Sequence, residues 1–386
     1  MQDTALPWLV FERTHSPVLV GLLVFCRYGP FAVLGLYGGV IADRFDNRRV
    51  LITAESAAMA FAIVLTFIAF SGAASLWSIY ALTVALGVSL AFDNPSKHAL
   101  IYRLVSRDEL PNAISLSITL QNAARIVGPA LGGVVIAAFG VGWCFLANAA
   151  SFVVLLACLL LMRTSEMFLA DRRDAQHAPP LRALRDGFAY ARSSRELQAL
   201  MGIALVFGLF GFSAIRTLMP VLAAQTLHRG PQTFGALYGS YGAGAVLGGL
   251  VSATLARASW RRLFAGASVF SGGAVLLAPV RSAALAAFLL ALIGGAWTTW
   301  ASQAQSIAVL AAPARLRGRV ISLFHFSLLI GVPFGGLLGG WLAGVGGTGL
   351  AFSVAGSAGL MATGTAALSL RREQRRARQR EAYAHE

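Results

Sequence analysis

Charged side chains occur deep inside stretches of this sequence that are otherwise apolar. Asp3, Arg27 and Arg125 each lie several residues from the nearest polar loop. An ionised side chain in hydrocarbon is costly, so such residues are usually paired or line a path for ions or substrates. At a rise of about 1.5 Å per residue, all three lie at similar depth, and we predict that Asp3 pairs with Arg27 or Arg125. Arg216 lies nearer one end of its stretch, where it meets an anionic substrate or extends to the membrane interface.

A second set of ionisable residues lies one or two helical turns inside the ends of apolar stretches. Asp93 and Lys97 are four residues apart around Pro95, and an acid before a base at this spacing is a favourable helix pair. This spacing favours a local ion pair over a substrate site. Glu55 and His325 lie at comparable depth, and a lone histidine is more often packed than a proton carrier. All four ionisable groups remain candidates for intramembrane charge or proton transfer.

The acidic residues are distributed unevenly along the chain. None occurs between Glu196 and Glu373, so the apolar stretches of the second half contain no carboxylate. If a carboxylate carries the proton of a coupled transport cycle, it is one of four in the first half: Asp3, Asp43, Glu55 and Asp93. Histidine is the alternative, since its charge changes near neutral pH.

One apolar stretch carries side chains suited to lining an organic ligand. The segment WTTWASQAQS provides four, Trp297, Trp300, Gln303 and Gln305. Ligand pockets combine apolar walls with a few polar groups, although the same groups could instead form hydrogen bonds between helices. The sequence has no phosphate-binding loop, zinc-ligand spacing or nucleophile elbow. It therefore supports neither an ATP-driven pump nor a membrane enzyme, and we expect no metal or cofactor.

The composition of the whole chain indicates what positions these residues. Of 386 residues, 57% are hydrophobic and 12% are charged, and the mean hydropathy is +0.70. Soluble domains carry roughly 25% charged residues, and about 20 apolar residues suffice to cross a bilayer as a helix. We therefore predict an all-α integral membrane protein. Its complete spans are expected at 17–42, 50–71, 76–101, 112–139, 142–162, 199–225, 232–256, 262–280, 282–310, 319–344 and 347–370.

Arginine is concentrated in alternate loops. The opposite loops contribute Arg13, Arg229 and Arg281, whereas the arginine-rich set comprises 43–49, 102–111, 163–198, 257–262, 311–319 and the tail from Arg371. The positive-inside rule then predicts a multi-pass protein of the cell inner (plasma) membrane with a cytoplasmic C-terminus. Because the net charge of +15 resides in these loops, we expect no nucleic acid as a partner. The expected partners are a small-molecule substrate and the lipid bilayer, and we expect a monomer. The tail would contact solvent or lipid headgroups.

The sequence also indicates an internal duplication. GPALGG at 128–133 and ISL at 114–116 have counterparts, GGLLGG and ISL, 207 residues further on. We predict twelve helices in a 6+6 pseudo-repeat with an incomplete first helix. TALPWLVF supplies about eight of the roughly 20 apolar residues required, so we expect an additional N-terminal segment to complete that span. The expected parts are a six-helix half at 1–162, a linker with an amphipathic helix at 163–198, a second half at 199–370 and a basic tail at 371–386.

The loop after the first complete span resembles that of a known family. GGVIADRFDNRR is similar to the signature of the major facilitator superfamily, Gly-x-x-x-Asp-Arg followed by a basic cluster. The match places five residues on key positions, Gly39, Asp43, Arg44, Arg48 and Arg49. Asp46 and Asn47 depart from the pattern, and the second-half counterpart SATLARASWRRLF has no aspartate. FDNPSKHALIYRLVSRDELPNAISL and RLRGRVISL resemble the branch containing the enterobactin exporter and related transmembrane secretion effectors.

A second motif resembles the antiporter-type segment of the same superfamily. ARIVGPALGG supplies Arg125, Gly128, Pro129, Gly132 and Gly133, and ordinary helix packing is the alternative reading.

In the loop motif, glycines permit close helix approach, and an aspartate can pair with a base or cap a helix N-terminus. We therefore expect the loop to act as a gate between helices. The alternative is that its arginines only set the membrane topology.

The resemblance implies a major facilitator fold and secondary active transport by alternating access. We expect proton-coupled efflux of a small organic compound, drug-like or siderophore-like, with the proton gradient as the energy source. The alternatives are an importer of the same fold and a truncated remnant that does not transport.

Overall fold

The computed structural model of the chain is built from helices. It describes all residues except 73–74, 107–108, 164–187, 255–257, 314–316 and 385–386. The helices of the first part are α1 (Gln2–Thr14), α2 (Pro17–Arg44), α3 (Asn47–Phe70), α4 (Leu76–Leu104), α5 (Leu110–Phe139) and α6 (Val141–Leu161). Those of the second part are α8 (Arg195–Val206), η2 (Phe207–Phe212), α9 (Ser213–Val221), η3 (Leu222–Thr226), α10 (Pro231–Thr254), α11 (Trp260–Leu277), α12 (Ala283–Leu310) and α13 (Arg317–Ala384).

Each of the eleven predicted spans coincides with helical structure. Within the described residues, eight helices are long and apolar enough to cross a membrane, and the last of these stretches runs for 53 residues. That stretch holds two predicted spans, because α13 breaks its helical geometry at Gly346 and Gly347, where Gly347 has φ 72°. The N-terminal segment before the first complete predicted span is helical, as α1.

Polar caps set several helix starts. The Asp46 side chain accepts hydrogen bonds from the backbone N–H groups of Arg48 and Arg49, so α3 begins earlier than its apolar residues suggested. Ser75 and Ser194 cap α4 and α8 in the same way. The predicted linker helix falls largely within 164–187, outside the described residues, whereas 188–193 is helical.

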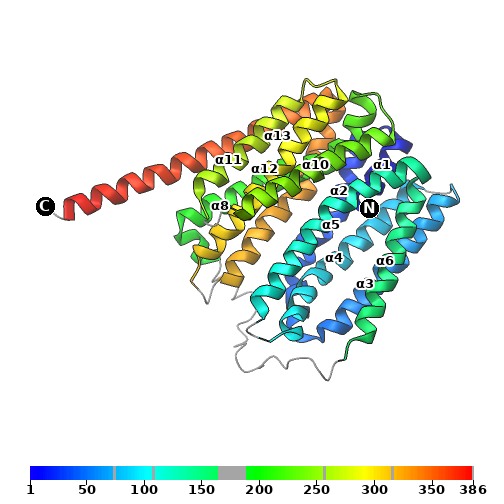
Figure 1. Ribbon diagram of the computed structural model, residues 1–386, viewed down its shortest axis with the longest axis horizontal. Helices are drawn as coiled ribbons and strands as arrows, with labels where there is room; N and C mark the ends of the chain where they lie inside the picture. The colour runs from blue at the N-terminus through cyan, green and yellow to red at the C-terminus, as the bar shows by residue number, and fades with distance from the viewer. Residues whose placement is uncertain (73–74, 107–108, 164–187, 255–257, 314–316, 385–386) are drawn as a thin grey trace.

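The helices form two groups (Figure 1). Helices α3 to α6 lie on one side, and α8, α10, α11 and α12 lie on the other. Two long contacts join the groups, α2 with α13 and α5 with α10. The basic tail was predicted as a separate part at 371–386. In the structure, α13 continues through this segment to Ala384 and projects beyond the bundle.

The contacts between the groups gather near the arginine-poor loops. Trp8 of α1 packs on Phe234 of α10 with ring centres 4.8 Å apart, and Gln225 donates a hydrogen bond to the carbonyl of His15, at 3.0 Å. On α5 and α10, Gly133 and Gly235 bring their backbones so close that a Cβ on either would overlap the other helix. Small residues permit such close packing within membranes. The two groups are therefore fitted tightly together at this end.

Candidate functional site

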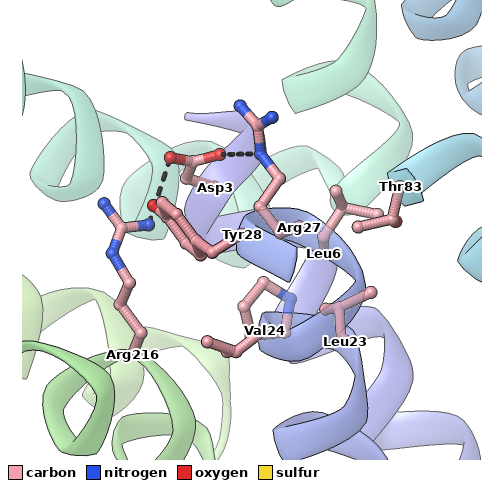
Figure 2. Close-up of a pocket in the computed structure, with 9 residues that line it drawn as sticks. Asp3, Leu6, Leu23, Val24, Arg27, Tyr28, Thr83 and Arg216 are labelled. Atoms are coloured by element: carbon pink, nitrogen blue, oxygen red, sulfur yellow. Dashed lines mark hydrogen bonds and ion pairs between the residues drawn. The ribbon is translucent and has the colours of Figure 1, made fainter. Parts of the chain in front are cut away.

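Asp3 lies between two arginines from different helices (Figure 2). Its carboxylate is 3.5 Å from Nε of Arg27 on α2 and 3.1 Å from Nη1 of Arg216 on α9. Arg27 also donates a hydrogen bond to the Leu86 carbonyl of α4, at 2.8 Å. The Asp3–Arg27 pair considered from the sequence is thus present, and Arg216 contacts Asp3. The side chain of Arg125, the other partner considered, lies outside the described part of the structure.

Aromatic rings surround Arg216. Its guanidinium carbon is 4.6 Å from the ring centre of Phe212 and 5.4 Å from that of Tyr28, distances at which cation–π attraction operates. Phe212 meets Tyr28 edge-on at 6.1 Å and stacks on Trp297 at 5.8 Å. The sequence reasoning missed Tyr28 and Phe212. The available signals were the position of Tyr28 directly after Arg27 and the helical spacing of four residues between Phe212 and Arg216.

The ion pairs and rings border a small pocket. It is lined by apolar side chains of α1 and α2 together with Asp3, Arg27, Tyr28, Thr83 and Arg216. Its internal space is about 20 Å³, room for a water-sized molecule. Asp3 and Arg27 lie on helices of the first part of the chain and Arg216 lies on a helix of the second part, so the Asp3–Arg216 contact joins the two parts.

A π-helical turn precedes Arg216. The helix from α8 to η3 changes at η2 from α to π geometry before the short α9 segment. A π turn inserts a residue into the helix and often occurs at functional sites. Phe212 ends this π turn and Arg216 follows it by four residues, so the local irregularity lies next to the site.

A separate charged cluster lies near the arginine-rich end. Lys97 Nζ is 2.8 Å from Asp93 and 2.8 Å from Glu55, so α3 and α4 are joined by one cation and two carboxylates. The local Asp93–Lys97 pair expected from the sequence is present, and Glu55 extends it. His325 on α13 is exposed, with Nδ1 3.0 Å from the Ile321 carbonyl of its own helix.

The loop motif is described in part. Gly39, Asp43 and Arg44 belong to α2, and the side chains of Asp43 and Arg44 lie outside the described part of the structure. Arg48 donates hydrogen bonds to the carbonyls of Leu159, at 2.7 Å, and Leu160, at 3.0 Å. It therefore neutralises the negative end of α6. Arg49 is exposed.

The antiporter-type motif lies on α5 where two other helices approach. Gly128 and Gly132 face Met1, which directly precedes α1, and Gly133 faces Gly235 of α10. The side chain of Pro129 lies outside the described part, as does that of Arg125. The described glycines thus form a packing surface, which was the alternative reading of this motif.

The four candidate lining residues on α12 occupy different environments. Trp297 is partly buried and touches the site through Phe212, and Gln305 is also partly buried. Trp300 is fully buried, and Gln303 is 4% exposed and accepts a hydrogen bond at 2.8 Å from the Ser259 backbone N–H. The expectation that Trp300 and Gln303 line a pocket is wrong for this structure, because both are enclosed by neighbouring helices. Gln303 instead forms the interhelical hydrogen bond that was the alternative.

Replacing Gln303 by Ala tests this correction. We expect the free energy of unfolding to fall by about 1 kcal/mol, because the partly buried Ser259 N–H loses its acceptor. The apparent affinity for any transported compound should stay unchanged. Gln305→Ala is the matched control, with little expected effect on the melting temperature in detergent. A large loss of substrate affinity with an unchanged melting temperature would restore Gln303 as a lining residue.

Comparison with known proteins identifies the family. The family model of transmembrane secretion effectors, within the major facilitator superfamily, matches residues 1–385. The chain therefore belongs to the transmembrane secretion effector family. Members of this family are multi-pass membrane transporters rather than enzymes, in agreement with the prediction from the sequence.

Curated relatives of the secretion effector include several named transporters. It is 28% identical to the staphyloferrin A transporter of Staphylococcus aureus over 60% of this chain and 57% of the relative. The macrolide efflux protein A of Streptococcus pyogenes is 24% identical over 70% of this chain and 66% of its own length. The enterobactin exporter of Shigella boydii is 31% identical over 66% and 59%. The match therefore spans less than two thirds of each of these relatives.

Solved transporter structures share the fold of the secretion effector. A bacterial homologue of the lysosomal transporter Spinster aligns with a TM-score of 0.68 and 15% identity, covering 95% of this chain and 90% of that one. The nucleoside transporter NupG aligns with a TM-score of 0.73 and 10% identity, covering 95% and 94%. At these identities the likeness concerns the fold.

Proposed function

We propose that the protein is a secondary transporter whose two six-helix halves, 1–162 and 199–370, alternate around the Asp3 site. In this arrangement α1 is the first helix, α13 supplies the last two, 163–198 is the linker and 371–386 is the basic tail. The contacts of α2 with α13 and of α5 with α10 support the proposal. Under the 6+6 scheme α2 corresponds to α10 and α5 corresponds to the first part of α13, so the two contacts are related by the repeat. The duplicated glycine segments at 128–133 and 335–340 lie on α5 and α13, which are related helices under this scheme.

The arginine distribution gives the proposed orientation. Arginine-rich loops face the cytoplasm of a cell with the protein in its inner membrane, and the C-terminal tail is cytoplasmic. The tight contacts between the helix groups then lie toward the outside, as at Trp8–Phe234. The structure would accordingly be the state closed to the outside.

Export of a small organic compound is the direction we propose. The named relatives include a macrolide efflux protein and an enterobactin exporter, and this supports efflux over the importer and remnant alternatives. The protein would act as a monomer in lipid, without nucleic acid or a cofactor. The observation that carries the proposal is the ion pair of Asp3 with Arg216, because it joins the two halves at a pocket.

A proton gradient is the proposed energy source. Three carboxylates in the described helices are candidate carriers, Asp3, Glu55 and Asp93. Asp3 is favoured because adding a proton to it would remove the charge that holds Arg216. Opening and closing of the two halves would thereby respond to protonation. Glu55 and Asp93 both pair with Lys97 within one half. Their protonation would therefore affect the contact between the two halves less directly.

Efflux from cells lacking their own exporters tests this function. Cells producing the protein should retain less of an exported compound, and a protonophore should abolish the difference because it removes the driving gradient. The Asp3→Asn variant should lose proton-driven efflux, whereas Glu12→Gln, at an exposed carboxylate of the same helix, should keep it. Efflux that persists with a protonophore would exclude proton coupling. Uptake in place of efflux would favour the importer.

A further inference from the structure

The composition of the Asp3 pocket points to a ligand class. We propose that Arg27, Arg216, Phe212 and Trp297 bind an aromatic organic anion, such as an aryl carboxylate, and that Asp3 is the internal anion which the ligand displaces. The inference rests on the proposed transport function, since it names the substrate class of the same site.

The charges of the pocket favour an anion. Its charged lining residues are two arginines and one aspartate, so the lining has an excess of one positive charge. Partly desolvated positive charges attract an anion more strongly than they would in water. An organic cation would instead meet both guanidinium groups. The site therefore selects against cationic amphiphiles.

The arginines retain hydrogen-bonding capacity beside Asp3. Arg27 Nε is buried and has no hydrogen-bond acceptor, and Asp3 lies 3.5 Å from it at the ion-pair distance only. Arg216 reaches Asp3 through a single nitrogen, Nη1. Guanidinium groups bind carboxylates most strongly through two parallel hydrogen bonds. A ligand carboxylate placed between the arginines could make the paired contacts that Asp3 leaves unmade.

The aromatic side chains supply a surface beside the charge. The ring of Phe212 lies 4.6 Å from the Arg216 guanidinium carbon and stacks on Trp297. Neither ring lines the pocket while Asp3 is in place, so an aromatic ring attached to the ligand carboxylate would reach them only after Asp3 has moved aside. Stacked or edge-on ring pairs add about 0.5–1.5 kcal/mol beyond burial of area, so an aryl anion should bind better than acetate.

Displacement of Asp3 also explains how a pocket this small admits a ligand. With Asp3 in place the internal space is about 20 Å³, too small for an aromatic molecule. The Asp3 side chain is 41% exposed, whereas those of Arg27 and Arg216 are 20% and 23% exposed. Asp3 is thus the member of the network that can turn toward water, leaving the arginines for the ligand. Releasing Asp3 from Arg216 also removes one contact between the halves, so binding would favour their separation.

Binding of salicylate to the full-length protein in nanodiscs tests the proposal. Isothermal titration should detect salicylate, and neutral salicylamide and cationic benzylamine should bind at least about tenfold more weakly, a difference of about 1.4 kcal/mol. Asp3→Asn should bind salicylate about tenfold more tightly, because the competing carboxylate is gone. Phe212→Leu should weaken binding several-fold, and Arg281→Gln, at an exposed arginine, should leave it unchanged.

The direction of the Asp3→Asn effect separates this site from its alternatives. A misfolded variant cannot bind more tightly, so a gain of affinity is informative whatever the yield of protein. Weaker salicylate binding by Asp3→Asn, or tighter binding of benzylamine than of salicylate by the unaltered protein, would overturn the proposal. Because titration needs no gradient, salicylate binding without transport would contradict the proposed function alone. Efflux of other compounds without salicylate binding would contradict the ligand class alone.

Discussion

The Asp3→Asn variant is expected to be less stable than Arg216→Gln, and adding Arg216→Gln to Asp3→Asn should restore part of the loss. Asp3 is the single carboxylate within ion-pair distance of Arg27 and Arg216 in the described pocket. Removing it leaves two neighbouring positive charges without their counter-ion. Removing Arg216 leaves the Asp3–Arg27 pair intact, and in the Asp3→Asn background it removes a repulsive charge.

The magnitude follows from the burial of the groups. Breaking a fully buried ion pair costs about 3–5 kcal/mol. Since the Asp3 side chain is 41% exposed, we expect about 1–2 kcal/mol for Asp3→Asn, and recovery of roughly half of it in the double variant. The measurement is the melting temperature of the four proteins in the same detergent. Arg229→Gln, an exposed arginine, is the control for loss of a positive charge. Additive losses would mean that Asp3 and Arg216 are not coupled.

Salicylate links this stability test to the ligand proposal. A ligand that binds the folded state raises stability in proportion to the logarithm of its concentration over its dissociation constant. Saturating salicylate should therefore raise the melting temperature of Asp3→Asn more than that of the unaltered protein. An equal rise in both proteins would show that Asp3 does not compete with the anion.

Sequence reasoning predicted the helices because membrane spans need long apolar runs. It also placed Asp3 and Arg27 at similar depth, since a charge within such a run calls for a partner. Arg216 could not be assigned to Asp3, because the two residues are 213 positions apart and helix order does not specify which faces meet. The π turn η2 lies directly before the α9 segment that carries Arg216, and the sequence FGLFGF carries no distinct signal for it.

Tertiary packing likewise decided the roles of polar residues on α12. Gln303 and Gln305 are two residues apart and equivalent by composition. Helical geometry turns them by about 200° relative to each other, so the neighbours of one differ from those of the other. Gln303 faces the start of α11, where Ser259 needs an acceptor. A sequence pattern predicts that such a face exists, and only the packed helices decide whether a ligand or a backbone group occupies it.

The largest loss of transport is expected from bulky replacements at Gly133 and Gly235. Each glycine lies against the backbone of the other where α5 crosses α10, and neither helix can move aside without losing contacts along its length. Gly235→Leu should therefore disfavour the state in which this end is closed. Overpacking costs about 1–3 kcal/mol, which corresponds to a reduction of roughly 5–150-fold in the population of the closed state.

Spin labels near the arginine-poor loops would measure that population directly. Glu12→Cys and Arg229→Cys place labels at exposed positions, one in each helix group. The distance distribution between them should shift to longer values in Gly235→Leu, and transport should fall in parallel. Gly339→Leu is the matched control, because no atom lies within 4 Å of a Cβ built on that α13 glycine.

The size dependence of the replacement identifies the cause of the loss. If the crossing acts as a gate, Ala, Val and Leu at Gly235 should reduce transport progressively, and the longer distances should appear in the same order. A helix that merely tolerates glycine would respond alike at Gly235 and Gly339. Equal responses at these two positions would mean that the glycine pair is ordinary packing and not a gate. A graded response at Gly235 alone would make closure of this crossing a required step of transport.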